Sequence, residues 1–190
     1  MKKKICIEGL MGSGKSSLIK GLSCAKKFST FEEQVMFDGK VDNGFLTQMK
    51  FLSSRHKQWN SKDLGSLNFF DRSVWSDIVF AMVSESYGYM SDSEYLLYKD
   101  GREILLNQCS KPDLVFYLEV HPEQCMTRIN ERGDVDSGTG YGFLLRQKVS
   151  YEMWMEDMER RGVEVITLDG TEEKQDILKD VIEITLDYFK

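Results

Sequence analysis

The chain has 190 residues, a formal net charge of −6 and 41% hydrophobic residues. That length is sufficient for one domain with a substantial core and a small lid. The acidic balance excludes a general nucleic-acid binder, because affinity for a phosphate backbone needs a basic surface. The apolar run that follows residues 1–4 stops at Glu8, too early for a signal peptide or a membrane span. We therefore expect a cytoplasmic protein that contacts neither nucleic acid nor membrane.

Apolar runs alternate with helical patterns along the whole chain. Strands are predicted at residues 4–8, 28–32, 66–70, 114–120 and 163–168, and helices at 15–26, 44–58, 74–87, 92–109, 122–132, 143–161 and 173–189. The strands are apolar throughout, which is typical of a parallel sheet buried on both faces. We therefore predict an α/β fold with a five-stranded parallel sheet flanked by helices, as a single domain over residues 1–190.

The first predicted strand leads into a phosphate-binding pattern. The pattern GxxxxGK[ST] is matched by Gly9-Leu10-Met11-Gly12-Ser13-Gly14-Lys15-Ser16, and the helix continues from Ser17. Glycines allow the backbone to fold over a polyphosphate, and the N–H groups at the helix N-terminus then face the anion. Lys15 can reach the β- and γ-phosphates, and the Ser16 hydroxyl can hold Mg²⁺. This strand–loop–helix context predicts a nucleotide-binding site.

Charged residues follow the second and third predicted strands. Glu32 and Glu33 come after the second strand, and Asp71 and Arg72 end the third. Because ligands bind at the carboxyl ends of parallel strands, both pairs are expected near the phosphate loop. A carboxylate there can accept a proton from a hydroxyl or order the magnesium shell, and an arginine can neutralise a transferring phosphoryl group. By itself, an Asp-Arg pair in this place is also typical of a helix N-cap with a surface ion pair.

The third strand also carries a family resemblance. The segment Asp71-Arg72-Ser73-Val74-Trp75-Ser76-Asp77 closely resembles the (Glu/Asp)-Arg-Ser segment of the deoxyribonucleoside kinases, a family of thymidylate-kinase-like P-loop phosphotransferases. Residues 7–17 are similar to the family's phosphate loop, and residues 112–118, 151–154 and 168–172 resemble later segments, so the resemblance covers nearly the whole chain. It implies a P-loop kinase fold with a short helical lid at about residues 128–142.

For the acceptor side, the resemblance implies that Glu33 is the general base on the sugar 5′-hydroxyl, with Glu32 as the second candidate. The family has Glu-Pro-Val after the second strand, and this chain has Glu33-Gln34-Val35. Gln48 is implied to read the Watson–Crick edge of the base, and Arg55 keeps the family spacing of seven residues on one helix face. Asp77 lies where members that prefer amino-bearing or purine bases have an aspartate paired with that arginine. The implied substrates are deoxyadenosine, deoxyguanosine or deoxycytidine.

For the donor side, the resemblance implies that ATP or GTP binds with Mg²⁺. Arg128 and Arg132 lie four residues apart on the lid helix and are implied to hold the donor phosphates. Together with Lys15 and Arg72 they would stabilise phosphoryl charge, while Ser16 holds the Mg²⁺ and Asp71 contacts it through water. Asp169 and Gly170 are implied to belong to the loop that holds the donor base.

The chain differs from the family pattern in the predicted lid and at the sugar site, as well as at Gln34. Asp134 stands where family lids commonly carry a third basic residue, and Asp136 is the counterpart of a lid acid that binds the sugar 3′-hydroxyl. Phe37 lies where the family has a tyrosine that helps to bind the sugar. The glycine-rich segment 137–142 is typical of a lid hinge or a surface loop.

The same patterns allow two other functions to be considered, and they also bear on the oligomeric state. A deoxynucleoside monophosphate kinase of thymidylate type has the same fold, but it would need further basic residues for the acceptor phosphate. A nucleotide-binding switch would need an Asn-Lys-x-Asp motif and a DxxG after the third strand, and the sequence has neither. The apolar positions of the helix at 92–109, among them Tyr95, Leu96, Tyr98 and Ile104, indicate core or dimer packing, and we expect a homodimer.

Overall fold

The sheet has the predicted strand number and direction. The computed structural model describes residues 2–25, 27–33, 44–133 and 140–190. Within these residues five strands pair in parallel in the order β2-β3-β1-β4-β5. Their bounds are β1 Lys3–Gly9, β2 Ser29–Phe31, β3 Leu67–Asp71, β4 Leu114–Glu119 and β5 Val165–Asp169. The predicted α/β class with a five-stranded parallel sheet is confirmed.

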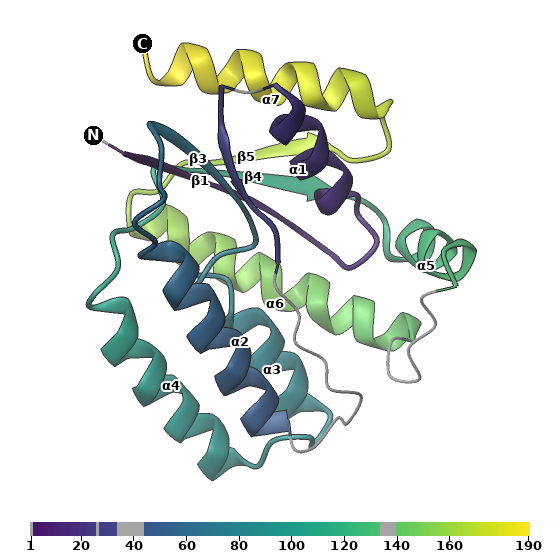
Figure 1. Ribbon diagram of the computed structural model, residues 1–190. Helices are drawn as coiled ribbons and strands as arrows, with labels where there is room; N and C mark the ends of the chain where they lie inside the picture. The colour runs from purple at the N-terminus through teal and green to yellow at the C-terminus, as the bar shows by residue number, and fades with distance from the viewer. Residues whose placement is uncertain (1, 26, 34–43, 134–139) are drawn as a thin grey trace.

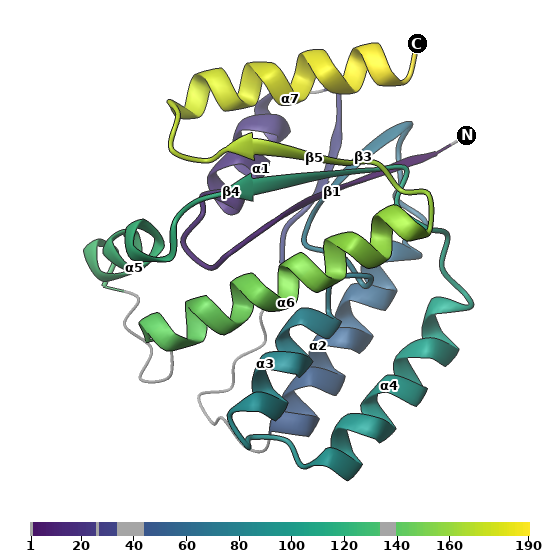
Figure 2. The same ribbon diagram turned by 180° about the vertical axis from the view of Figure 1, so that it is seen from behind.

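Helices cover both faces of this sheet. The described helices are α1 Lys15–Cys24, α2 Gly44–Trp59, α3 Ile78–Ser86, α4 Asp92–Leu106, α5 Pro122–Glu131, α6 Tyr141–Arg160 and α7 Lys174–Tyr188. Figure 1 shows α1 and α7 above the sheet and α2, α3, α4 and α6 below it. Helix α5 lies beyond the carboxyl ends of β4 and β5, and the same arrangement is seen from behind in Figure 2.

Side chains of the central strands alternate between two apolar clusters. Ile5 and Ile7 pack in the cluster with α1 and α7, whereas Cys6 between them packs in the cluster with α3 and α6. This two-residue period is the geometry of a strand covered on both faces. The edge strands are different, because β2 and β5 contain half-buried or exposed side chains. The predicted burial on both faces therefore holds for β1, β3 and β4 but was wrong for the edges.

The turn after β3 delays helix α3 to Ile78, four residues later than the sequence pattern predicts. Arg72 has a left-handed backbone with a φ of 63°. The Ser73 N–H donates to the Ser76 hydroxyl at 3.1 Å, and the Ser76 N–H donates to the Ser73 hydroxyl at 3.1 Å. Serine side chains that bond to nearby backbone offer the chain an alternative to a helix. This turn determines where the flanking Arg72 and Asp77 lie.

Helix α6 is bonded to β1 and to the loop that follows it. The Gln147 Oε1 accepts from the Met11 N–H at 3.0 Å, and the Tyr151 hydroxyl donates to the Glu8 Oε2 at 3.1 Å. Gln147 and Tyr151 are four residues apart and share one face of the helix. Glu8 is fully buried, and this burial raises its pKa to about 7 even though bonding by Ser76 and the charges of two arginines act in the other direction.

This buried carboxyl makes the stability of the fold depend on pH. Because the pKa of Glu8 is raised from 4.5, the folded chain binds more protons than the unfolded chain between that value and about 7. The stability from this group therefore falls as the pH rises through that window. Glu8→Gln keeps the size and removes the ionisation. We compare the unfolding free energy of Glu8→Gln with that of the native chain. The difference, variant minus native, should be roughly 2 kcal/mol more positive at pH 8 than at pH 5.

Urea unfolding at the two pH values measures this difference directly. A free-energy difference between the two proteins that is the same at both pH values would contradict the assignment of a raised pKa to Glu8.

Candidate active site

The loop between β1 and α1 has the backbone shape of an anion site. Gly12 and Gly14 have φ values of 80° and 110°, which favour glycine. A Cβ on Gly12 would also lie 2.6 Å from the Cys125 carbonyl oxygen of α5. Helix α1 begins at Lys15, so its unsatisfied N–H groups and positive end face the loop. The predicted phosphate-binding pattern therefore has the strand–loop–helix context that it requires.

Lys15 lies along the inside of this loop. Its Nζ donates to the Gly9 and Leu10 carbonyl oxygens at 2.9 and 2.7 Å. Burial lowers the pKa of Lys15 to about 8, and the nearby charge of Arg72 acts in the same direction. The amine is therefore a buried cation at neutral pH, held at the mouth of the predicted phosphate site.

Two oxygen ligands lie next to each other at the start of α1. The Ser16 hydroxyl donates to the Asp71 Oδ2 at 2.8 Å, and the buried Asp71 Oδ1 has no partner among the described residues. Within these residues, no cluster of three or more His, Cys, Asp or Glu side chains could enclose a metal ion. Mg²⁺ is usually held by one or two protein oxygens together with phosphates and waters. The Ser16–Asp71 pair fits that kind of site.

Glu33, the second residue after β2, lies between two arginines from different elements. The Arg72 Nη1 donates to the Glu33 Oε2 at 2.7 Å, and the Arg55 Nη2 of α2 donates to the Oε1. Burial opposes ionisation of Glu33, but the charges of Arg72 and Arg55 outweigh it and lower the pKa to about 2. Glu33 is therefore a fixed, ionised carboxylate at any physiological pH.

Arg55 also pairs with a second buried acid. Its Nη1 donates to the Asp77 Oδ1, and the Asp77 Oδ2 accepts from the Tyr98 hydroxyl of α4 at 2.5 Å. The Arg55–Asp77 pair implied by the sequence is thus formed. Gln48, on the same face of α2, donates to the Ser84 hydroxyl at 3.2 Å, while its buried Oε1 has no partner among the described residues. An amide, a guanidinium and a carboxylate together form a polar recognition surface.

A cavity of about 680 Å³ lies on the other side of the phosphate loop. Its walls come from α1, the end of α5 and the loop before α7, and they include Gly14, Ser17, Arg128, Arg132 and Gly170. Arg128 bridges two of these walls, because its guanidinium donates to the Ser13 and Gly170 carbonyl oxygens at 3.2 and 3.1 Å. Five of the residues implied for the donor nucleotide therefore line one cavity, whereas Lys15, Ser16 and Asp169 are not among its lining residues.

Asp169 is arranged differently from its neighbours in the donor loop. Its Oδ1 accepts from the Thr171 N–H at 2.8 Å and from the Thr171 hydroxyl at 2.6 Å, so that oxygen stabilises the turn. Phe37, Asp134 and Asp136 lie outside the described residues, as do residues 137–139 of the glycine-rich segment.

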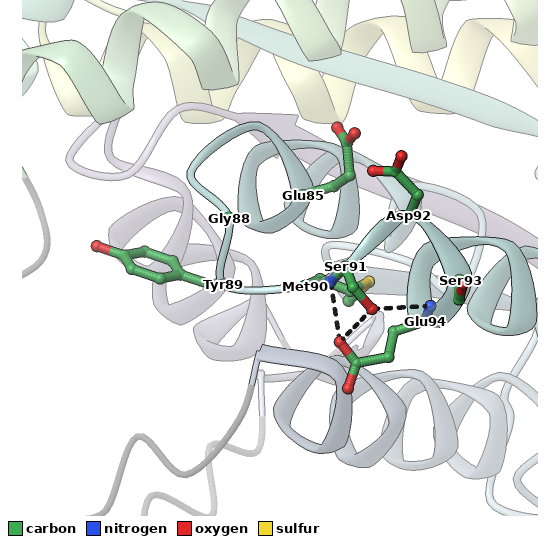
Figure 3. A pocket seen from close by; sticks show the side chains of 8 residues that line it. All are labelled: Glu85, Gly88, Tyr89, Met90, Ser91, Asp92, Ser93 and Glu94. Atoms are coloured by element: carbon green, nitrogen blue, oxygen red, sulfur yellow. Dashed lines mark hydrogen bonds between the residues drawn. The ribbon is translucent and has the colours of Figure 1, made fainter.

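A second cavity, of about 580 Å³, lies between α3 and α4 and is drawn in Figure 3. Glu85, Asp92 and Glu94 line it, so its charge would repel a phosphate group. Figure 3 also shows the bonds between Ser91 and Glu94, which are a capping box at the start of α4. The Ser91–Glu94 hydrogen bonds in this cavity cap helix α4 and do not indicate a ligand site. The candidate active site is therefore the one around the phosphate loop.

Sequence reasoning missed three residues of the site. Gln147 holds a backbone amide of the phosphate loop, Tyr98 holds Asp77, and Tyr151 holds the strand residue just before the loop. The only sequence signal for Tyr98 was a position on the apolar face of its helix. The contacts themselves arise from the tertiary arrangement.

Comparisons with known proteins show which family the chain resembles over nearly its whole length. A family model described as deoxynucleoside kinase matches residues 5–186. A deoxyadenosine kinase of Dictyostelium discoideum is 28% identical over 82% of this chain and 68% of that protein. A deoxyadenosine/deoxycytidine kinase of Bacillus subtilis (strain 168) is 28% identical over 80% of this chain and 76% of that protein.

A solved structure of similar shape supports the fold. It is a deoxyadenosine kinase from M. mycoides with the products dCMP and a flexible dCDP bound, at a TM-score of 0.82 and 21% identity. The alignment covers 97% of this chain and 99% of that one. The predicted P-loop kinase fold and the predicted class of enzyme are confirmed. Since the family model matches nearly its whole length, the chain belongs to the deoxynucleoside kinase family.

Proposed function

We propose that the chain transfers the γ-phosphoryl group of ATP or GTP to the 5′-hydroxyl of deoxyadenosine, deoxyguanosine or deoxycytidine. The observation that carries this proposal is the Glu33 carboxylate, held ionised by Arg55 and Arg72 beside the phosphate loop. The names of the two curated relatives, a deoxyadenosine kinase and a deoxyadenosine/deoxycytidine kinase, support this class of base.

On the acceptor side, Glu33 orients the 5′-hydroxyl and accepts its proton. A carboxylate with a pKa of about 2 is a weak base, so its main contribution is to hold the hydroxyl in line with the phosphoryl group. This is sufficient for a loose transition state, in which positioning and charge stabilisation outweigh proton removal. Arg72, bonded to the same carboxylate, places a positive charge where charge develops on the transferring group.

On the donor side, the phosphates lie over the start of α1 and the base enters the cavity lined by Arg128, Arg132 and Gly170. Lys15 and the two lid-helix arginines supply positive charge along the polyphosphate. Ser16 would hold Mg²⁺ directly and Asp71 through water, and the ion neutralises phosphate charge when it is bound. The buried Asp71 Oδ1, which has no hydrogen-bond partner within the described part of the chain, supports this assignment.

Gln48, Arg55 and Asp77 select the base. The Gln48 amide offers both a donor and an acceptor, so it can bond the edge of any nucleobase. The Arg55–Asp77 pair adds fixed charges beside it and favours bases with an amino group or a purine N7. A polar site of this kind rejects analogues that leave its groups unpaired, which disfavours thymidine.

We also propose a homodimer in the cytoplasm. Leu97 and Ile104 on α4, and Val149 and Met153 on α6, are exposed apolar side chains. Each pair has helical spacing, and Figure 2 shows both helices on the side of the molecule that faces the viewer. A second copy of the chain would remove this apolar surface from water.

None of the described helices has the length and apolar character needed to cross a membrane.

The proposed reaction is tested with a panel of substrates. The purified protein is assayed with the four deoxynucleosides and their monophosphates, each with ATP and with GTP. We expect kcat/KM to be at least about tenfold higher for one of the three favoured deoxynucleosides than for thymidine. Every monophosphate should be a poorer acceptor, because Arg55 and Arg72 already bond to Glu33. Preferred turnover of a monophosphate would instead establish the thymidylate-kinase alternative, and preference for thymidine would contradict the base assignment.

The role of Glu33 is tested against its neighbour in the chain. Glu33→Gln keeps the shape and removes the charge that Arg55 and Arg72 surround, so kcat should fall about a hundredfold or more. Glu32→Gln is the matched control, because Glu32 is exposed one residue earlier. Steady-state kinetics of both variants, with thermal unfolding as a check on folding, measure the contrast. A larger loss in the Glu32 variant would move the acceptor carboxylate to that residue.

The proposed interface is tested by placing a charge on it. Ile104→Asp puts a carboxylate on the exposed apolar face of α4 and should convert a dimer into a monomer in sedimentation equilibrium. Leu186→Asp makes the same change on α7, on the other side of the sheet, and should leave the dimer intact. A native protein that sediments as a monomer at micromolar concentration would refute the proposal.

A further inference from the structure

Tyr98 is a fully buried side chain of α4 that the proposed reaction does not use. Its ring belongs to the apolar cluster below the sheet, together with Leu52, Val79 and Met90. Its hydroxyl lies 2.5 Å from the Asp77 Oδ2, to which it donates. Burial raises the pKa of Tyr98 well above its ordinary value, so the hydroxyl keeps its proton and remains a donor.

The hydroxyl occupies one of the two oxygens of Asp77. The other oxygen, Oδ1, accepts from the Arg55 Nη1, and the Arg55 Nη2 donates to Glu33 instead of to Asp77. The Arg55 guanidinium is thus shared between two carboxylates: Asp77, near the proposed base site, and Glu33, which receives the acceptor hydroxyl in the proposed reaction. Arginine and a carboxylate otherwise favour a bidentate pair, in which both nitrogens bond to the same group.

We propose that Tyr98 is a positioning residue for base selection, because its hydroxyl holds the Asp77 Oδ2 and so keeps Arg55 shared between Asp77 and Glu33. Without that donor, Asp77 can turn both oxygens toward Arg55 and draw the guanidinium away from Glu33. Arg55 would then present different nitrogen positions to the base. This inference rests on the proposed function, in which Arg55 faces the nucleobase.

The chain offers a matched pair of variants for the test. Tyr98→Phe removes only the hydroxyl and keeps the buried ring. Tyr95→Phe makes the same change three residues earlier on α4, where the half-buried ring packs beside the Lys99 amine. Both variants are assayed as full-length protein with the four deoxynucleosides at saturating ATP, and with ATP varied at a saturating deoxynucleoside.

Tyr98→Phe should raise KM for the preferred deoxynucleoside about tenfold, the size expected for one hydrogen bond to a charged group. The ratio of its kcat/KM to that of thymidine should fall at least about threefold, while KM for ATP stays unchanged. Tyr95→Phe should resemble the native protein in all three quantities. Unchanged selectivity in Tyr98→Phe, or an equal rise in KM for ATP and for the deoxynucleoside, would overturn the inference.

A double-mutant cycle tests whether Tyr98 acts through Asp77. Asp77→Asn keeps the shape of the side chain and removes its charge. Because Tyr98 and Asp77 act through one shared hydrogen bond, the effects of Asp77→Asn and Tyr98→Phe on selectivity should not add in the double variant. Additive effects would show that Tyr98 does not act through Asp77. A native protein that phosphorylates no deoxynucleoside would refute the proposed function itself, which is a different outcome from a failure at Tyr98.

Discussion

The arrangement of the acceptor side depends on one buried network of charges. Glu33 and Asp77 carry two negative charges, and Arg55 and Arg72 balance them. A buried charge costs several kcal/mol unless it is paired and hydrogen-bonded, so loss of any one member leaves another uncompensated. Because the four residues come from the end of β2, from α2 and from the turn after β3, this requirement fixes how those elements meet.

The sheet order explains why this network lies beside the phosphate loop. Strand β1 pairs with β3 and β3 with β2, so the ends of all three strands meet at one edge. Lys15 is close enough for its pKa to respond to Arg72, Asp71 and Glu33. Helix α6 supports the same edge from below through Gln147 and Tyr151. Donor and acceptor groups are therefore positioned by the strands and helices that form the core.

Features that depend on local spacing were predictable from the sequence. The phosphate loop, the twelve helices and strands of the described residues and the shared face of Gln48 and Arg55 all follow from residue periods and glycine positions. Contacts between distant residues were not predictable, since Tyr151 bonds to Glu8 across 143 positions. Tyr98 has the helical spacing of an ordinary core residue, and this spacing does not indicate that its hydroxyl bonds to Asp77. The late start of α3 was missed because a left-handed Arg72 has no strong sequence signal.

In the proposed reaction, the carboxylate between Arg55 and Arg72 receives the acceptor hydroxyl. A crystal structure of the protein with deoxyadenosine and a non-hydrolysable ATP analogue would measure the distance from the 5′-oxygen to Glu33. We expect this oxygen to lie within hydrogen-bond distance of the Glu33 carboxylate, with the base edge at Gln48 and the analogue's base in the cavity near Arg128. A deoxynucleoside whose 5′-oxygen bonds to another carboxylate, with Glu33 still closed between its two arginines, would contradict it.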